Sequence, residues 1–289
     1  MDAVGRIERT LSAALAAASG PGGPPLLAGA MSHAVFPRGA RVRPRLALAV
    51  AAACGDDDAA AADGAAAAIE LLHCASLVHD DLPCFDDADM RRGRPSVHRA
   101  FGEPLAVLAG DALIVLAFQT IAAGAQRSPL RLPSLLMILG RAVGMPHGIA
   151  AGQAWESEPV ADLGQYQRAK TGALFAAATM AGAAAAGFDP EPWRALGEQL
   201  GEAYQVADDL ADVLSDATAQ GKPTGRDGAL GRPNAVLSLG VAGAMRHLES
   251  LAAAAADSIP ACPGAAGLKT LTLSEARRLV PRDLSQHAA

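Results

Sequence analysis

Alanine-rich segments constrain the fold of this chain more than any other feature of its sequence. Hydrophobic residues make up 51% of the 289 residues and aromatic residues only 3%, so alanine runs such as 59–68 and 176–186 supply much of the apolar content. Alanine is the best helix former and a poor strand former. The composition therefore predicts an all-α protein whose helices approach one another closely.

Helical periodicity covers most of the chain, and no alternation of apolar and polar residues is long enough for a strand. Glycine and proline mark the helix ends, beginning with the break at 20–25. Further helices are predicted from about residue 26 and over 44–53, 63–81, 104–124, 134–144, 163–187, 192–215 and 234–258. Ser134 is the expected N-cap of one of them. Because no long linker interrupts these segments, we expect one domain over residues 1–289.

Charge and cysteine content exclude several classes of protein. The net charge of −6, from 24 Lys+Arg against 30 Asp+Glu, argues against general nucleic-acid binding. The four cysteines have neither CxxC spacing nor a regular framework, which indicates free thiols and a cytoplasmic location. The N-terminus lacks the apolar core of a signal peptide. No membrane span is expected, because the longest uncharged run, 172–188, is too short and is predicted to be a buried helix.

Two aspartate clusters are the most informative chemical feature. One occupies residues 80–89 at the end of an apolar helix, and the other occupies 208–212 within an apolar stretch that we expect to be mostly buried. On a helix, Gln205, Asp208 and Asp212 share one face. Packed carboxylates repel one another unless a cation lies among them. Mg²⁺ bound together with a phosphate-bearing substrate is the natural compensation, although a solvated acidic face is the alternative for either cluster alone.

Basic side chains complete the pattern of a diphosphate site. Two follow the first acidic cluster, two lie in an early turn, and two occur in segments otherwise short of charge. In that order they are Arg91, Arg92, Arg41, Arg43, Lys170 and Lys222. Each alone is usually a solvated surface charge. Together with both acidic clusters they favour a polyanion such as diphosphate, which arginine binds in bidentate fashion and lysine as a point charge.

These segments resemble the trans-isoprenyl diphosphate synthases, most closely the bacterial geranylgeranyl diphosphate synthases. Residues 70–83 with Asp86, Asp87, 91–93 and His98 look like the first aspartate-rich motif of that family, and 205–212 like the second. Segments 41–44, 152–153, 170–172 and 221–227 are similar to further family motifs, in the same order. The resemblance spans about residues 30–240. It implies an isoprenoid synthase-type helical bundle around a central apolar cavity.

The resemblance also implies a reaction. A prenyltransferase of this family condenses isopentenyl diphosphate with an allylic diphosphate: dimethylallyl, geranyl or farnesyl. Three Mg²⁺ ions and several basic side chains would neutralise the departing diphosphate, so that the carbon–oxygen bond ionises in a water-excluded cavity. The isopentenyl double bond attacks the allylic cation, and the released diphosphate takes the proton. The family further implies a homodimer.

Roles for individual residues follow from the same resemblance. The implied metal ligands are Asp80, Asp81 and Asp86 of the first motif and Asp208 and Asp212 of the second. Allylic diphosphate would be bound by Arg91, Lys170 and Lys222, and isopentenyl diphosphate by Arg43, His73 and Arg92. Thr171 and Gln205 would lie beside the developing carbocation, and Gln153 belongs to a further substrate-binding motif. Helical geometry does not distinguish Asp86 from Asp87, but the family pattern favours Asp86.

One position departs from the family pattern. Ala40 stands where the family usually has a lysine for isopentenyl diphosphate, and Arg38 or Arg41 is the candidate replacement. After the Lys222 motif, Arg232 stands where the family has another lysine, so the positive charge is kept.

Product length is expected to depend on Ala75 and Ser76, which lie about 6 to 7.5 Å below Asp80 along a helix. Farnesyl-producing relatives place an aromatic residue there. Its absence favours geranylgeranyl diphosphate, as in synthases of carotenoid and chlorophyll pathways, while Leu113 or Phe118 remains an alternative floor for the pocket.

The same residues leave several other functions open. A farnesyl diphosphate synthase and a catalytically silent partner subunit are the nearest alternatives, and the change at Ala40 is compatible with the second. A terpene cyclase would carry Asn, Ser or Thr and Glu at wider spacing where this chain has Asp208 to Asp212. A metal-dependent phosphohydrolase built on His79 and Asp80 would leave Lys170 without a role.

Overall fold

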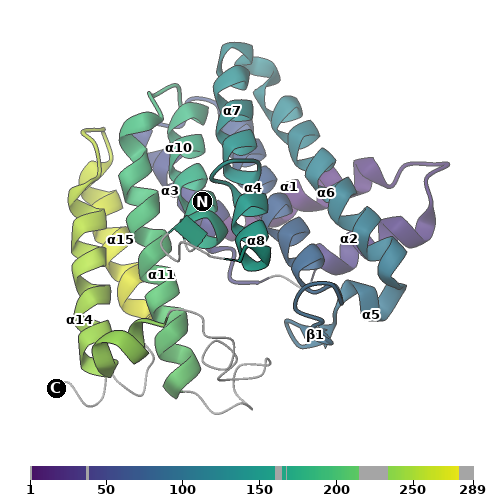
Figure 1. The fold of residues 1–289 in the computed structure, drawn as a ribbon. Helices are drawn as coiled ribbons and strands as arrows, with labels where there is room; N and C mark the ends of the chain where they lie inside the picture. Colours follow the sequence, from purple (N-terminus) through teal and green to yellow (C-terminus); the bar gives the residue numbers. More distant parts are fainter. Residues whose placement is uncertain (1, 37–38, 160–164, 167, 215–233, 280–289) are drawn as a thin grey trace.

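The computed structural model describes residues 2–36, 39–159, 165–166, 168–214 and 234–279. Within these ranges the regular structure is helical apart from one small hairpin (Figure 1), which confirms the predicted all-α class. The α-helices are α1 (Ala3–Ala18), α2 (Pro25–Val35), α3 (Val42–Cys54), α4 (Ala59–Asp80), α5 (Val97–Phe101), α6 (Glu103–Gly124), α7 (Leu132–Val143), α8 (Ile149–Ala154), α10 (Ala173–Ala185), α11 (Arg194–Leu214), α14 (Ala235–Asp257) and α15 (Ala265–Leu279).

Short elements connect the helices. The 3₁₀ turns are η1 (Ala125–Arg127), η2 (Pro129–Arg131), η3 (Trp155–Ser157) and η5 (Glu191–Trp193), and η4 (Arg168–Gly172) is a turn of π-helix. Strands β1 (Met90–Arg91) and β2 (Arg94–Pro95) pair in antiparallel register. Arg92 and Gly93 join them with φ angles of 51° and 75°, as a two-residue primed turn requires. The strands are too short to show the alternation on which a strand prediction depends.

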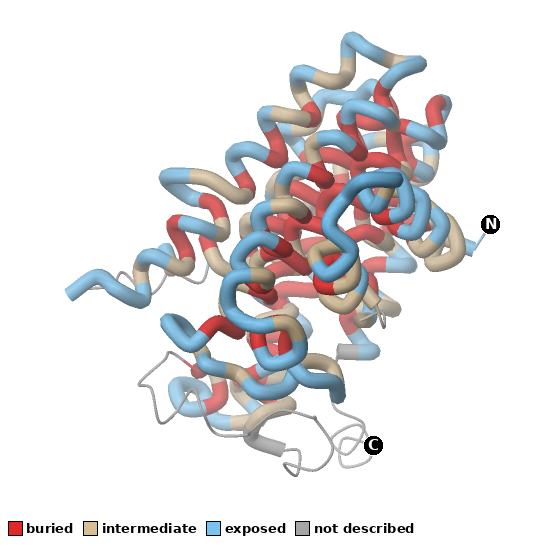
Figure 2. Tube along the Cα trace, turned by 90° about the vertical axis from the view of Figure 1, so that its right-hand side faces the viewer, coloured by how far each residue is buried: buried red, intermediate tan, exposed pale blue. Residues whose placement is uncertain are grey.

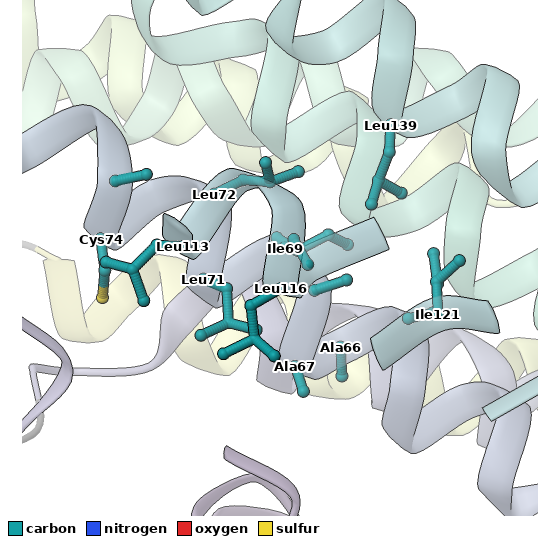
Figure 3. Packing of buried hydrophobic residues seen from close by; sticks show 14 of the residues in the cluster. Ala66, Ala67, Ile69, Leu71, Leu72, Cys74, Leu113, Leu116, Ile121 and Leu139 are labelled. Atoms are coloured by element: carbon teal, nitrogen blue, oxygen red, sulfur yellow. The ribbon is translucent and has the colours of Figure 1, made fainter. Parts of the chain in front are cut away.

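Helix α4 forms the centre of the core, where it packs against α3, α6 and α10 (Figure 1). Buried residues are concentrated in the middle of the molecule (Figure 2). Leu113 and Leu116 of α6 lie beside Cys74, Leu71 and Ala67 of α4 (Figure 3). This packing fixes the end of α4, at which the first acidic motif begins.

Small residues let the central helices touch backbone to backbone. A Cβ at Gly182 of α10 would lie 2.4 Å from the carbonyl oxygen of Ala47 in α3. On α11, a Cβ at Gly197 would lie 2.4 Å from the Cα of Ala176 in α10. Helix α10 is thus held between α3 and α11. The predicted close approach is confirmed, and so is the predicted burial for residues 174–185, whereas Gly187 and Phe188 lie beyond the end of α10 and are exposed.

The observed helix ends differ from prediction at several points. Ser134 lies inside α7, which begins at Leu132 after Arg131, because the fixed φ of Pro133 suits the first turn of a helix. Asn234 caps α14 through hydrogen bonds from the amides of residues 236 and 237, as the predicted boundary suggested. The helix predicted over 163–187 is divided between η4 and α10, and residues 163, 164 and 167 of it lie outside the described ranges. The predicted spans do not include helices α5, α8 and α15.

Two segments, Ala59–Asp80 and Glu103–Arg127, are long and apolar enough to cross a membrane by length and composition alone. In α4, 78% of the relevant window is buried, so this helix belongs to the protein core. In the segment that includes α6, 44% is buried. Helix α6 therefore presents apolar side chains on the outside of the bundle.

Candidate active site

The first acidic motif begins at the last residue of α4 and folds back on it. The amide of Asp86 donates to the carbonyl oxygen of Asp80 at 2.9 Å, and the amide of Ala88 donates to that of Asp81 at 3.1 Å. Burial raises the pKa of Asp80, and the charge of Asp86 raises it further. The tight turn after α4 therefore places two carboxylates, Asp80 and Asp86, close together.

Asp87 is held on the other side of this turn. Its backbone adopts a left-handed φ of 44°. Its carboxylate contacts Arg99 at 3.2 Å and the ring of His98 at 3.8 Å, both in α5. Asp87 thus fastens the loop to α5, which leaves Asp86 as the partner of Asp80. The two neighbouring aspartates therefore have different surroundings.

Asp81 is buried and paired with Arg91. The Arg91 Nε lies 3.0 and 3.2 Å from the two carboxylate oxygens, and Nη2 makes a further contact. The pKa of Arg91 is raised because Asp81, Asp80 and Asp86 together outweigh its burial. Arg91 therefore stands among the carboxylates of the first motif, held by the residue that follows Asp80.

In the second motif, neighbouring aspartates have different surroundings. Asp209 is buried and accepts hydrogen bonds from Gln205 Nε2 at 3.1 Å and from the amide of Ala235 at 2.7 Å, so it fastens the start of α14 to α11. Asp208 is exposed, which corrects the expectation that it points into a buried face. The apolar side of α11 carries Asp209, not Asp208. The charge of Asp208 raises the pKa of Tyr204, although burial of that phenol is the larger cause.

The π-helical turn η4 connects the two motifs. Lys170 Nζ lies 3.3 Å from Asp80 Oδ1 at the end of α4. The hydroxyl of the next residue, Thr171, donates to Gln205 Oε1 on α11 at 3.2 Å. π-Turns recur at functional sites, and here the extra residue lets consecutive side chains reach two different helices. The end of α4, 90 positions from Lys170, and α11, 34 positions from Thr171, therefore both contact η4.

Glu156 is a site residue that sequence reasoning missed. Its carboxylate lies 2.5 Å from Lys170 Nζ and accepts hydrogen bonds from Tyr166 Oη at 2.7 Å and Gln153 Nε2 at 2.9 Å. The pKa of Lys170 is raised, since Asp80, Tyr166 and Glu156 outweigh the effect of burial. The sequence signal for Glu156 is its position three residues after Gln153, which places the two side chains on one face of a helix.

A second cluster of basic side chains surrounds His73. Arg43 Nη1 lies 3.5 Å from His73 Nε2, and the Arg43 guanidinium stacks over the Phe175 ring at 4.5 Å. Burial lowers the pKa of His73 well below its ordinary value, and the charges of Arg43 and Arg92 add to this effect, so the ring is neutral near pH 7. The buried Arg43 Nε has no hydrogen-bond partner among the described residues. This cluster is suited to binding an anion.

Arg92 reaches that cluster by lying against Gly39. A Cβ at Gly39 would be 2.7 Å from the Arg92 guanidinium carbon, so a larger residue would displace the side chain. Ala40, the next residue, is exposed.

Arg41 is enclosed away from this cluster. Its side chain donates to Glu70 at 2.6 Å, to Glu8 at 3.0 Å and to the carbonyl oxygen of Val35 at 2.9 Å. Tertiary packing therefore surrounds the Arg41 guanidinium with carboxylates of α1 and α4, which argues against the expected substrate contact. Arg38 and Lys222 lie outside the described residues.

The residues expected to limit product length lie below the first motif. Ala75 is buried, and the Ser76 hydroxyl donates to the carbonyl oxygen of His73 at 2.9 Å. Leu113 of α6 belongs to the same core cluster as Ala75, and Phe118 packs against that cluster.

The carboxylates of the two motifs fit magnesium better than a softer metal. Their donors are hard oxygens, whereas the described ranges contain no group of three or more His, Cys, Asp or Glu side chains gathered to hold a metal. Mg²⁺ prefers oxygen ligands and takes the remaining ones from water and a phosphate-bearing substrate.

Comparison with known proteins assigns the family. Residues 24–258 match the polyprenyl synthetase family. The chain is 54% identical over 280 residues to a geranylgeranyl diphosphate synthase of Cereibacter sphaeroides, covering 97% of each chain. It is 53% identical over 275 residues to a geranylgeranyl diphosphate synthase of Rhodobacter capsulatus, covering 95% of each. The chain belongs to the polyprenyl synthetase family.

A solved structure extends the match to three dimensions. The geranyltransferase of Helicobacter pylori, in a complex with magnesium and isoprenyl diphosphate, superposes with a TM-score of 0.79 at 29% identity and covers 96% of each chain. The isoprenoid synthase-type helical fold implied by the sequence motifs is thus confirmed.

Proposed function

We propose that this protein is a geranylgeranyl diphosphate synthase formed by one domain. It joins isopentenyl diphosphate to an allylic diphosphate and releases diphosphate. The observation that carries this proposal is the meeting of both acidic motifs at η4, through Lys170 with Asp80 and Thr171 with Gln205. The near full-length similarity to geranylgeranyl diphosphate synthases supports the product assignment.

Asp80 and Asp86 are the ligands proposed for two Mg²⁺ ions, and Asp208 with Asp212 for a third. Bound magnesium supplies charge neutralisation of the departing diphosphate. Asp81 acts mainly by holding Arg91 in place, because its oxygens already face that guanidinium. The magnesium and isoprenyl diphosphate in the related geranyltransferase support this assignment.

Residues of the chain itself prepare the allylic substrate for ionisation. Lys170 and Arg91 present positive charge beside the carboxylates of the first motif, where the diphosphate leaves with the bonding electron pair. Thr171 and Gln205, whose side chains are hydrogen-bonded to each other, are the residues proposed to lie beside the allylic cation. The released diphosphate accepts the proton that the condensed product loses, so no protein base is assigned.

Arg43, His73 and Arg92 bind the diphosphate of isopentenyl diphosphate. The neutral His73 ring would make a hydrogen bond without adding charge, and Arg43 Nε, which has no hydrogen-bond partner among the described residues, offers a further donor. Of the two candidate replacements for the family lysine at Ala40, Arg41 is enclosed and Arg38 lies outside the described residues. We therefore expect a weaker isopentenyl site than the family pattern implies.

A homodimer through α6 is the oligomeric state that we propose. Three apolar side chains of this helix are exposed: Val107 at 42%, Leu108 at 50% and Val115 at 56%. A second copy of the chain would cover this face. Light scattering after size-exclusion chromatography tests the proposal, with Val115→Asp expected to yield monomers and a monomeric wild type counting against it.

The catalytic proposal is tested by product analysis. Purified protein is incubated with Mg²⁺, isopentenyl diphosphate and each allylic primer in turn, and the prenyl alcohols are identified after phosphatase treatment. Geranylgeraniol is expected as the main product. Farnesol alone would favour the farnesyl diphosphate synthase alternative, and no condensation would favour a silent partner subunit.

A further inference from the structure

We propose that Glu156 is a positioning residue that keeps the Lys170 ammonium at the diphosphate site when Asp80 is occupied by metal. This inference rests on the proposed roles of Lys170 and Asp80.

The contacts of Lys170 place it between two carboxylates. Its Nζ lies 3.3 Å from Asp80 and 2.5 Å from Glu156, and the Lys170 and Glu156 side chains are 22% and 21% exposed. The nearer partner is thus the residue outside both aspartate-rich motifs. Charge-assisted hydrogen bonds of this kind are stronger than neutral ones.

Neighbouring groups hold the Glu156 carboxylate in place. It accepts from Tyr166 Oη at 2.7 Å and from Gln153 Nε2 at 2.9 Å. Helix α8, which leads into Glu156, packs directly on η4, because a Cβ at Gly152 would lie 2.6 Å from the Lys170 amide nitrogen. The carboxylate is therefore fixed relative to the backbone that carries Lys170.

Metal binding would remove one of the two described carboxylate partners of Lys170. A cation held by Asp80 would compete for its carboxylate oxygens and would repel the ammonium group. Glu156 then remains as the counter-charge, so the half-buried ammonium has no need to turn towards bulk water. With glutamine at position 156, the Lys170 ammonium would lack this negative partner. It would then either pair more tightly with Asp80 or leave the site.

Kinetics of Glu156→Gln test the proposal, with Glu158→Gln as the matched control because Glu158 is exposed and lies two residues further along the same segment. We expect Glu156→Gln to raise both the KM for allylic diphosphate and the Mg²⁺ concentration for half-maximal rate by about tenfold, as for loss of one hydrogen bond to a charged group. The KM for isopentenyl diphosphate should change less than about twofold. Glu156→Asp, which keeps the charge on a shorter side chain, should restore part of the loss.

A double-mutant comparison separates this proposal from the proposed function. If Glu156 acts through Lys170, the double variant Glu156→Gln with Lys170→Gln should be no worse than Lys170→Gln alone. Additive losses, equal effects on both substrates, or no loss in Glu156→Gln would overturn the positioning role. An unaffected Lys170→Gln would instead overturn the role proposed for Lys170. Melting temperatures of all variants are compared first, and Glu156→Asp serves as the test variant if Glu156→Gln does not fold.

Discussion

Lys170 Nζ lies 3.3 Å from Asp80 Oδ1, although 90 positions separate the two residues in the chain. The contact joins a π-helical turn to the end of the central helix α4. Because Thr171, the next residue, hydrogen-bonds Gln205 on α11, one short turn sets the separation of the two acidic motifs. A displacement of η4 would therefore disturb both acidic motifs at once.

Asp86 and Asp87 should differ sharply when each is replaced by asparagine. Asp86 stands beside Asp80, whereas Asp87 is paired with Arg99 and His98. Asp86→Asn should lower kcat/KM by about 100-fold or more, as for loss of about 3 kcal/mol of transition-state stabilisation. Asp87→Asn should lower it less than about fivefold, because exposed ion pairs contribute about 1 kcal/mol or less. Steady-state assays at saturating Mg²⁺ make the comparison, and the reverse order would show that Asp87 is the ligand.

Arg41 and Arg43, two positions apart, should separate stability from activity. Arg41→Gln leaves Glu70 buried without its main counter-charge and should lower the free energy of unfolding by about 3 kcal/mol. Arg43→Gln should raise the KM for isopentenyl diphosphate by about tenfold or more. Urea denaturation and steady-state kinetics are measured on both variants. A large KM effect in a fully folded Arg41→Gln protein would contradict the structural role assigned to Arg41.

Restoring the family lysine should strengthen the isopentenyl site. Ala40 is exposed, so Ala40→Lys introduces the side chain without steric conflict. One added charge contact of about 1 kcal/mol would lower the KM for isopentenyl diphosphate about fivefold. Ala17→Lys, at an exposed position on α1, adds the same charge elsewhere and should leave this KM unchanged. Equal effects of the two variants would point to net charge as the cause.

His73 should make stability depend on pH. Burial and the charges of Arg43 and Arg92 lower its folded-state pKa well below the unfolded value of about 6.5. The unfolded chain therefore binds more protons below that pH, and the contribution of His73, complete above about 6.5, is lost as pH falls towards the folded pKa. Urea denaturation between about pH 7.5 and 5 should show up to about 1.4 kcal/mol lost per pH unit from this group. His73→Gln should have a shallower slope, and an unchanged slope would assign the effect to other groups.

Ala75 should influence product length. Ala75→Phe is expected to shift the main product from geranylgeraniol to farnesol, because the added ring blocks the path of the growing chain. Ala75 is fully buried, so overpacking should also cost about 1–3 kcal/mol of stability. Ser76→Phe, at a half-buried position, gives a second variant that is expected to be better tolerated. An unchanged product distribution in both folded variants would place the pocket floor elsewhere, at Leu113 or Phe118.

The helical class, most helix spans and the acidic motifs could be predicted because they depend on local features of the sequence. Alanine propensity, apolar periodicity and prolines act within a few residues, so α6 and α14 were placed to within about two residues. The start of α7 and the whole of α15 were missed, since their local signals compete with packing against other helices.

The different roles of adjacent charged residues were decided only by the tertiary structure. Asp87 turns to α5, Asp209 fastens α14, and Arg41 is enclosed by Glu70, which is 29 positions away. Neighbouring residues of the same chemical type look equivalent in a sequence, because the local sequence does not specify which distant group will contact each of them. The sequence by itself determined that this protein is a helical bundle with two acidic motifs, and packing of remote segments selected the charges that face the site.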